Sequence, residues 1–424
     1  MISPARRVSL GLLERIESRR LHSDDALNSP AMERLEVRDR HLVTEIVYGT
    51  LRWRGPLDHL LAARSARPWA EVEPATRTLL RMSLYQMWKM GRVPDHAVCN
   101  DAVELARRES GRGSDRYVNG ILRGLGRARP WERPGFLDGA PGWVRLSLPR
   151  WLYQRWVRRW GAAQAEEFAL SLNRPPRAAF RLTDAEGEGE TPPGESSPLV
   201  PGARLSLDEA PPGGRAHLQD EASQLMPHLF GPAGQGGRVW DACAAPGGKT
   251  AVLGGIFGRV VSSDISPGRV RRMLELLRAQ GVRPGGVIVA DAGGPAPFGV
   301  EFDAALADVP CSGLGTLRRN PEIKWNFKPE EFAALGRVQA AILRSVSQSV
   351  AVGGRLLYST CSTEPEENER VVEDFLGAHP GFRIEEPRYP EGVAAWVGTD
   401  GCVRTFPSAR RWDGFFAALL RRWN

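Results

Sequence analysis

The sequence predicts an α/β fold, a doubly wound parallel sheet, preceded by an all-α region. Two observations predict the sheet. Four apolar runs in the second half of the chain each end in an aspartate, and helical patterns such as residues 269–279 alternate with them. Sheets of this type bury their strands and bind ligands at the carboxyl ends. A third observation, apolar residues at helical spacing through the first 130 residues, predicts the all-α region.

Residues 1–130 are therefore expected to form a helical bundle. Its apolar stripes are these: Leu42, Val43, Ile46, Val47 and Leu51; Leu79, Leu80, Leu84, Met87 and Trp88; Val98, Ala102 and Leu105; Tyr117, Ile121 and Leu125. Asp39 is expected to cap the first stripe. Because such stripes form the core of a bundle, any function of this region must lie on its Arg-rich outer faces.

Residues 131–216 are expected to form a linker and a Trp/Arg-rich subdomain that binds RNA. Tryptophans interleave with arginines between 143 and 181, and aromatic faces with guanidinium groups suit stacked bases and phosphates. The alternative is that the tryptophans pack a helix into the core and the arginines are merely solvated. Both interpretations stay open. Residues 186–212, rich in Gly, Pro, Ser and acid, are predicted to be a loop or a weakly structured insertion without chemistry.

Residues 217–424 are expected to carry the sheet and the chemistry. The stretch Asp241-Ala-Cys-Ala-Ala-Pro-Gly-Gly-Lys-Thr250 joins an apolar strand to an apolar helix through a glycine turn. Glycine lets the backbone approach a ligand, and a helix N-terminus offers unpaired N–H groups. A P-loop is excluded, because Cys243 stands where that motif needs its first glycine. Residues 414–420 are predicted to be the final buried strand.

Strand-end acids indicate a nucleoside site at the edge of this sheet. They are Asp241, Asp264, Asp291 and Asp308. Asp264 follows Asp241 by 23 residues, close to the roughly 20 at which such folds place an acid on a ribose. Any one of these acids alone could be a helix cap. Four in succession favour a nucleoside ligand.

Two cysteines follow predicted strand ends as well. Cys311 lies in Asp308-Val-Pro-Cys-Ser-Gly313, and Cys361 lies in Ser359-Thr-Cys-Ser362. The capping-box spacing of Thr363 and Glu366 predicts a helix that begins beside Cys361, and a helix N-terminus lowers a thiol pKa. Nearby glutamates act in the opposite direction, so the sequence leaves the direction of the net shift open. A single cysteine is more often a buried hydrophobe, but two beside a nucleoside site indicate reactivity.

Charge and cysteine usage indicate the compartment and the class of partner. The formal net charge of +7 favours a polyanionic partner. Five cysteines without a C-x-x-C pair fit a reducing cytoplasm. Glu14 and Arg15 interrupt the first apolar residues before a signal or membrane segment could form. We expect a cytoplasmic monomer without a membrane segment.

The three motifs around Cys243, Cys311 and Cys361 resemble those of S-adenosylmethionine-dependent RNA cytosine-C5 methyltransferases. With Asp39-Arg-His-Leu-Val-Thr-Glu-Ile-Val-Tyr-Gly-Thr-Leu-Arg-Trp53 and Val118-Asn-Gly-Ile-Leu-Arg123, nearly the whole chain is similar to the RsmB/Sun/Fmu type of 16S ribosomal RNA methyltransferases. The resemblance implies a Rossmann-like class I methyltransferase domain after a helical domain like the RNA-binding factor NusB. It also implies S-adenosylmethionine as cofactor.

The resemblance further implies a role for each motif residue. Cys361 is the implied nucleophile, Cys311 assists release, and Asp308 stabilises the charge that develops on the base. Asp264 would hold the ribose and Asp291 the adenine end. The implied cofactor residues are Cys243, Ala244, Ala245, Pro246, Gly247, Gly248, Lys249, Asp264, Asp291 and Asp308. The expected RNA contacts are Arg155, Trp156, Arg158, Arg159 and Lys324.

Attack of a thiolate on cytosine C6 makes C5 nucleophilic enough to accept a methyl group, and this covalent route needs no metal. Two alternatives stay open. One is the same chemistry on transfer RNA or another RNA. The other is an RNA-binding assembly or antitermination factor without activity. Enzymes that methylate DNA cytosine use a Pro-Cys cysteine, a precedent that would favour Cys311 as nucleophile.

Overall fold

The structure is a computed structural model that describes residues 2–91, 93–109, 113–182, 194–206, 216–232, 234, 236–407 and 412–424. Its internal contacts divide the chain into two compact units. The helical unit comprises Met1–Arg174 and Leu317–Asn326, and the sheet unit comprises Pro175–Thr316 and Phe327–Asn424. The predicted boundaries at 130 and 216 differ from this division, since the helical unit runs on to Arg174 and takes in a later segment.

The helical unit is built around the predicted apolar stripes. Its longer helices are α1 (Pro4–Glu17), α4 (Val37–Arg52), α5 (Arg54–Ala62), α6 (Pro74–Lys89), α7 (Asp95–Glu109), α8 (Ser114–Ala128), α10 (Arg150–Trp160) and α11 (Ala162–Leu172). Shorter turns are α2 (Ser23–Leu27), α3 (Pro30–Glu33) and α9 (Gly142–Arg145). Val43, Leu79, Val98 and Leu125 share one buried core. Helix α4 begins two residues before the predicted cap Asp39, and Glu36 is its N-cap residue.

The packing of Trp156 on helix α10 distinguishes between the two interpretations of this residue. The Trp156 side chain is fully buried, stacks on Trp160 with ring centroids 5.7 Å apart, and meets Phe168 of α11 edge-on at 4.7 Å. A buried ring offers no face to a nucleic acid base, so Trp156 is a core residue and its predicted RNA contact is wrong. Arg158 and Arg159 are exposed on the same helix.

Residues 317–326, which follow the Cys311 motif, cap two helices of the helical unit. Trp325 Nε1 donates to Leu51 O at 2.7 Å, and Asn326 Nδ2 donates to Ile16 O at 3.0 Å. The last carbonyl groups of a helix lack intrahelical partners, and Trp325 provides a donor to the end of α4. At the end of α1, Asn326 adds a second donor to Ile16 O, which also accepts from Arg19 N at 3.0 Å. Helix α15 (Ile323–Asn326) thus provides side-chain hydrogen-bond donors to two helices formed by the first 174 residues.

Lys324 of this segment is the second predicted RNA contact that the structure contradicts. Its side chain is 1% exposed, and Nζ donates to Arg52 O at 3.1 Å. Burial holds the pKa of Lys324 well below its usual value, and the nearby Arg52 guanidinium lowers it further. The Nζ group of Lys324 therefore faces the interior of the helical unit and is inaccessible to an RNA phosphate.

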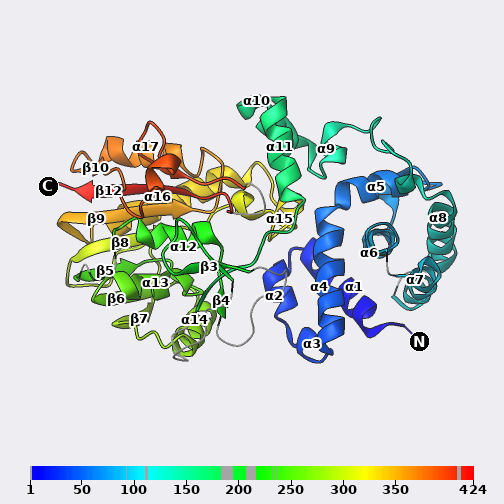
Figure 1. Ribbon diagram of the computed structural model, residues 1–424, viewed down its shortest axis with the longest axis horizontal. Helices are drawn as coiled ribbons and strands as arrows, with labels where there is room; N and C mark the ends of the chain where they lie inside the picture. Colours follow the sequence, from blue (N-terminus) through cyan, green and yellow to red (C-terminus); the bar gives the residue numbers. More distant parts are fainter. Residues whose placement is uncertain are drawn as a thin grey trace. The chain divides into compact units, whose positions relative to one another are not determined.

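The sheet unit contains an eight-stranded sheet (Figure 1). Its strands are β5 (Arg238–Asp241), β6 (Arg259–Asp264), β7 (Gly286–Val289), β8 (Phe302–Asp308), β9 (Val350–Thr360), β10 (Phe382–Ile384), β11 (Val403–Arg404) and β12 (Phe416–Arg422). The order is β10-β12-β9-β8-β5-β6-β7, with β11 beside β12. The five strands from β9 to β7 are parallel, as predicted, whereas β12 is antiparallel to β9.

Helices cover both faces of this sheet because its strands are apolar on both sides. On one face, α12 (Glu221–His228) and α13 (Gly248–Ile256) pack against residues that include Val239 and Leu306. On the other, α16 (Glu331–Ser347) and α17 (Glu369–Ala378) pack against residues that include Trp240 and Tyr358. The chain reverses direction across the sheet between β5 and β8. In doubly wound folds, ligands bind at the carboxyl ends beside such a switch point.

A small antiparallel sheet precedes the large one and corrects the prediction for residues 186–212. Its order is β2-β3-β1-β4, from Glu195–Ser196, Ala203–Leu205, Ala179–Leu182 and Ala216–Leu218. Two of its strands thus lie inside the stretch that we expected to be a loop, and Ala203 and Leu205 are buried. Residues 186–193 and 207–212 of the same stretch lie outside the described residues.

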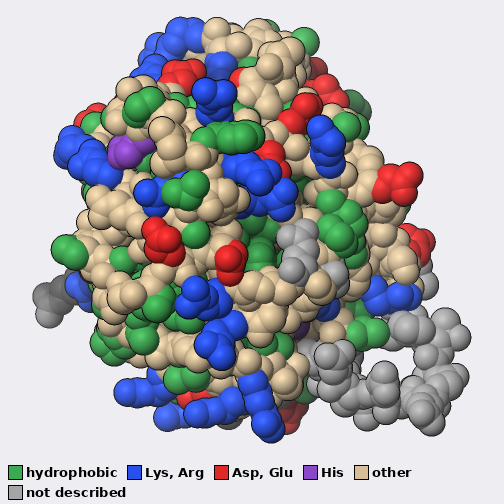
Figure 2. Space-filling view, turned by 90° about the vertical axis from the view of Figure 1, so that its left-hand side faces the viewer, with side chains coloured by type: hydrophobic (Ala, Val, Ile, Leu, Met, Phe, Trp, Pro, Cys, Tyr) green, Lys and Arg blue, Asp and Glu red, His purple; other side chains and the backbone are tan. Residues whose placement is uncertain are grey.

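The molecular surface is basic, as its net charge requires. Figure 2 shows Lys and Arg side chains spread over one face, with Asp and Glu side chains among them. Within the described ranges no helix is long and apolar enough to cross a membrane. The same ranges hold no group of three or more His, Cys, Asp or Glu side chains placed to bind a metal ion.

The packing of Trp156 predicts a large loss of stability when its ring is removed. Trp156→Ala should lower the free energy of unfolding by about 3–5 kcal/mol, the usual effect of emptying a large aromatic site in a core. Arg158→Ala, its exposed neighbour, should change it by less than about 0.5 kcal/mol. Urea unfolding followed by circular dichroism measures both. Equal stabilities for the two variants would contradict the assignment of Trp156 to the core.

Candidate active site

The ends of β8 and β9 bring the two motif cysteines together. The strands pair in parallel with Asp308 opposite Ser359, and Val309 N donates to Ser359 O at 3.0 Å. The segment that follows each strand then turns away from the sheet. The Sγ atoms of Cys311 and Cys361 lie 3.2 Å apart. Both thiols are free and half-buried. Two residues 50 positions apart in the sequence thus share one site.

The segment after Cys361 differs from its prediction. Helix α17 begins at Glu369 rather than near Thr363, and Asn368 is its N-cap residue. Asn368 Oδ1 accepts a hydrogen bond from Thr360 Oγ1 at 2.6 Å, and its Nδ2 donates to Ser362 O at 2.9 Å. These bonds hold residues 361–368 as a turn. The argument that a helix N-terminus adjoins the Cys361 thiol is therefore wrong.

A hydrogen bond between the thiols distinguishes them instead. The bond to Cys361 raises the pKa of Cys311 well above its usual value, and burial raises it further. Cys311 is thus protonated at neutral pH and can donate its S–H to the neighbouring sulfur. The geometry of this contact admits either sulfur as the donor.

Asp308 lies beside the thiols and accepts from two sides. Lys249 Nζ donates to Asp308 Oδ2 at 2.8 Å, and Ser359 Oγ donates to Oδ1 at 2.7 Å. Burial works to lower the pKa of Lys249, but the charge of Asp308 and its hydrogen bond outweigh burial, and the net shift is upward. Lys249 is therefore an ammonium that neutralises Asp308. The pair joins the glycine turn to the end of β8.

The glycine turn between β5 and α13 borders a cavity of about 150 Å³. The cavity is lined by His217, Leu218, Gln219, Ser223, Asp241, Cys243, Ala244, Ala245, Pro246, Gly248, Lys249 and Asp308. Most of the predicted cofactor residues thus surround one space. Gly247 does not line it. That residue has φ +108°, and a Cβ there would lie 2.8 Å from Met273 Cγ, so a glycine is needed for the close approach of α14 (Pro267–Ala279).

The chemistry of this cavity fits the S-adenosylmethionine that the resemblance implies. Asp241 is fully buried, and its Oδ2 accepts from Thr250 Oγ1 at 2.7 Å, whereas its Oδ1 has no partner among the described atoms. Gln219 Oε1 likewise lacks a partner there. Unpartnered buried acceptors call for a ligand with N–H donors or positive charge, and S-adenosylmethionine carries both an ammonium and a sulfonium. The cavity accommodates part of such a ligand.

The other two predicted cofactor acids do not line the cavity. Asp264, at the end of β6, is 3% exposed, and its Oδ1 accepts from Ser266 N and from the Arg269 guanidinium, each at 2.9 Å. Asp291 follows β7, is exposed, and accepts from Gly293 N at 2.9 Å. Both lie after strands on the same carboxyl edge as Asp241. Contact of Asp264 with a ribose would require Arg269 to share or release that carboxylate.

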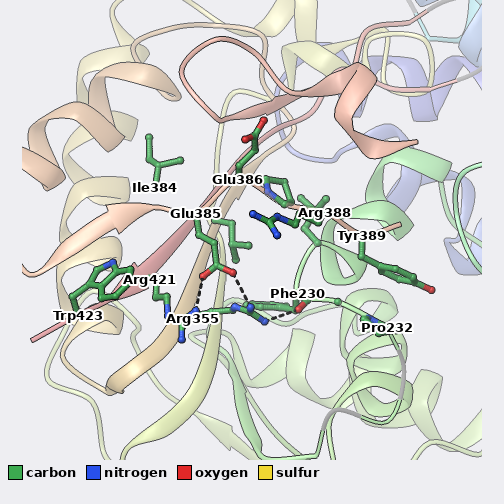
Figure 3. Close-up of a pocket in the computed structure, with 14 residues that line it drawn as sticks. Phe230, Pro232, Arg355, Ile384, Glu385, Glu386, Arg388, Tyr389, Arg421 and Trp423 are labelled. Carbon is green, nitrogen blue, oxygen red and sulfur yellow. Dashed lines mark hydrogen bonds and ion pairs between the residues drawn. The ribbon is translucent and has the colours of Figure 1, made fainter. Parts of the chain in front are cut away.

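A larger cavity, of about 540 Å³, lies elsewhere in the sheet unit (Figure 3). Glu385 stands between two arginines there, with Oε1 2.7 Å from Arg355 Nη2 and Oε2 3.5 Å from Arg421 Nη1. The described residues that line this cavity include no cysteine, histidine or lysine. Glu385 pairs with Arg355 and Arg421, and Arg388 and Tyr389 line the cavity as well.

Sequence reasoning missed residues that support the site from outside the motifs. Gln219 and His217 reach the cavity from strand β4 and the residue after it, and Glu367 hydrogen-bonds the turns after both cysteines. Glu367 stood out only as one of several glutamates whose charge opposes a thiolate. Its six-residue distance from Cys361 follows no catalytic spacing, and its partners come from a different strand end.

The buried Asp241 predicts a pH-dependent stability. Burial raises its pKa to about 7, whereas an unfolded chain ionises near 3.9. Between these values the folded protein binds a proton that the unfolded chain lacks, so the free energy of unfolding falls as pH rises from 4 to 7. The loss should reach about 4 kcal/mol above pH 7 and vanish below pH 4. Urea unfolding from pH 4 to 8 measures it.

Asp241→Asn should flatten that curve, because its amide does not titrate. Asp374→Asn changes an exposed acid on α17 and serves as the control, which should follow the wild-type curve. Identical pH profiles for wild type and Asp241→Asn would contradict the raised pKa of Asp241.

Comparison with known proteins agrees with this geometry. The model of the family "16S rRNA methyltransferase RsmB/F" matches residues 232–421, and that of the NusB family matches residues 3–127. A Bacillus subtilis protein named "Probable ribosomal RNA small subunit methyltransferase B" is 32% identical over 98% of this chain and 98% of its own. Ribosomal RNA small subunit methyltransferase B of Thermus thermophilus is 35% identical over 91% and 90%.

A solved structure shares the whole fold. The crystal structure of PH0851 superposes with a TM-score of 0.77 over 100% of this chain and 99% of that chain, at 24% sequence identity. That likeness concerns the fold, while the two relatives carry the sequence relationship. Since they are at least 32% identical and span at least 91% of this chain, it belongs to the RsmB/F family of S-adenosylmethionine-dependent methyltransferases, with a NusB-family region at its N-terminal end.

Proposed function

We propose that this protein methylates C5 of a cytosine in small-subunit ribosomal RNA. The contact between the Cys311 and Cys361 thiols, beside the Lys249–Asp308 pair, is the observation that carries the chemistry. The names of the relatives, ribosomal RNA small subunit methyltransferase B, support the substrate. A cytosine ring needs a nucleophile, a charge-stabilising group and a proton acceptor, and this edge of the sheet offers sulfur, ammonium and carboxylate groups together.

Cys361 is the nucleophile in this proposal. Its thiolate forms a bond to cytosine C6, and the ring electrons move so that C5 becomes an enamine carbon. Cys311 can donate its S–H to the Cys361 sulfur before attack. After methyl transfer, a base removes the C5 proton, the C6–sulfur bond breaks, and the electron pair returns to Cys361. Cys311 assists this release.

Asp308 and Lys249 stabilise the charge that develops on the base. Attack at C6 places negative charge toward N3, and a proton shared there stabilises it. Lys249 Nζ donates to Asp308 Oδ2, so the Lys249 ammonium is the proton donor of the pair. Ser359 keeps the carboxylate oriented through Oδ1.

S-adenosylmethionine supplies the methyl group as an electrophile. Residues Cys243 to Lys249, with Asp241 and Asp308, would hold its charged end in the cavity, where Asp241 Oδ1 is available as an acceptor. Asp264 would bind the ribose and Asp291 the adenine end. Their positions after β6 and β7 support this order, since successive parallel strands present their ends along one edge.

The helical unit is proposed to bind the RNA. Its NusB-family region and the exposed Arg158 and Arg159 support this role, while Arg155 is half-buried and offers less surface. Two other functions are separable by experiment. Methylation of transfer RNA would appear in bisulfite sequencing of total RNA with and without the protein, and a purely RNA-binding factor would change no cytosine.

Replacing each cysteine separately tests the assigned roles. Cys361→Ala should abolish methyl transfer and form no covalent adduct, because it lacks the attacking sulfur. Cys311→Ala should still attack and methylate but release slowly, so that a protein–RNA complex stable to denaturing electrophoresis accumulates. Labelled methyl transfer to small-subunit ribosomal RNA, with the same gel, measures both. A stable complex with Cys361→Ala instead would exchange the two roles.

The exposed arginines of α10 should contribute to RNA affinity through phosphate contacts. Arg158→Gln with Arg159→Gln should weaken binding and reduce the slope of log K against log salt by about 1.4, the value for two contacts to a single strand. Arg271→Gln with Arg278→Gln removes two exposed charges from α14 and is the matched control. Filter binding at a series of salt concentrations measures the slope for each double variant. Equal slopes for the two would contradict a specific role of α10.

A further inference from the structure

One buried carboxylate holds the turns that carry both cysteines. Glu367 is fully buried in the turn before α17. Its Oε1 accepts from Ser312 N at 2.7 Å, and its Oε2 accepts from Ser312 Oγ and Ser362 Oγ, each at 2.5 Å. Ser312 follows Cys311, and Ser362 follows Cys361. A single side chain therefore connects the neighbours of the two thiols.

Glu367 is itself tied to the body of the sheet unit. Tyr358 Oη, on β9, donates to Glu367 O at 2.5 Å. Gln339 Nε2, on α16, donates to Glu367 Oε1 at 3.1 Å and to Pro310 O at 3.0 Å, which precedes Cys311. The carboxylate is thus fixed from two packed elements. Both cysteine turns are held against it.

The contacts of Glu367 suit an ionised carboxylate. Four donors converge on the two oxygens, and an ionised carboxylate has lone pairs for all of them. Within the described residues, Glu367 has no ion-pair partner, so hydrogen bonds alone compensate its burial. Burial raises its pKa, while the bonds from Ser312, Ser362 and Gln339 act in the opposite direction. Removing the carboxylate would leave buried donors without an acceptor, which a fold avoids by moving them.

We propose that Glu367 is a positioning residue that sets the separation of the Cys311 and Cys361 thiols. This inference rests on the proposed function for its catalytic meaning, because a shared site for attack and release needs both sulfurs within reach of one base. The role of Glu367 in setting the thiol separation does not depend on catalysis. Glu367 touches neither sulfur and acts through Ser312 and Ser362.

Formation of a Cys311–Cys361 disulfide measures the thiol separation without RNA or cofactor. Oxidised glutathione takes up the two electrons, the two thiols lose their protons and become one disulfide, and two molecules of glutathione thiol leave. The rate depends on whether the two sulfurs meet. Peptide mass spectrometry after alkylation quantifies the product. Methyl transfer to ribosomal RNA, with kcat and KM resolved, is measured on the same variants.

Glu367→Ala should slow disulfide formation about tenfold to a hundredfold, the factor that corresponds to one lost hydrogen bond to a charged group. It should lower kcat by a similar factor. KM for RNA should stay nearly unchanged, because Glu367 is fully buried and offers no contact to RNA. Glu367→Gln should stay within about threefold of wild type in both assays, because serine hydroxyls can turn to accept from its amide.

Glu385→Ala, which removes the ion-paired carboxylate of the larger cavity, is the control and should match wild type in both assays. Thermal unfolding of every variant shows that the sheet unit is folded.

Wild-type disulfide rates in Glu367→Ala would overturn the positioning role. So would a wild-type protein that forms no Cys311–Cys361 disulfide, because the thiol contact would then be absent. If Glu367→Ala loses methyl transfer but oxidises normally, the proposed function stands and the positioning role fails. If wild type transfers no methyl group while the order of oxidation rates holds, the positioning role stands and the proposed function fails.

Discussion

The parallel pairing of β8 with β9 determines the geometry of the whole site. Asp308 stands opposite Ser359, so the residues that follow the two strands leave the sheet side by side. A shift of one residue would turn every side chain of one strand to the other face. It would separate Asp308 from Ser359 and the thiols from each other. The apolar residues on both faces of the sheet pack against α12 and α13 on one side and against α16 and α17 on the other.

Much of this arrangement could be predicted because local pattern and topology agree. Apolar runs that end in acids identify parallel strands, and the ends of such strands meet at one edge, so Asp241, Asp264 and Asp308 were placed without long-range information. The turn after Cys361 could not be placed in that way. Thr363 and Glu366 have the spacing of a helix start, but α17 begins only at Glu369. Hydrogen bonds from Ser312, 55 positions away, to Glu367 compete with that local preference.

The wrong RNA contacts have a related cause. Exposed lysines and interleaved tryptophans look the same in a sequence as buried ones, because burial depends on partners far away in the chain. Lys324 meets the carbonyl of Arg52, 272 positions earlier, and Trp156 meets Phe168 on the next helix. Neither partner forms a pattern with the residue it contacts. The exposed Arg158 and Arg159 on α10 were predicted correctly as surface residues only because charged side chains seldom bury without a partner.

The capping of α1 and α4 by residues 317–326 has a consequence for synthesis of the chain. Ribosomes release domains from the N-terminal end, and an early domain ordinarily folds as soon as it emerges. Here Trp325 and Asn326 complete helices that end at Arg52 and Glu17, so the helical unit stays unfinished until residue 326 of 424 has been made. The intervening residues 175–316 take on the order of ten seconds to translate. During that interval Leu51 O lacks its Trp325 donor, and Ile16 O lacks its bond from Asn326 while it keeps the one from Arg19 N.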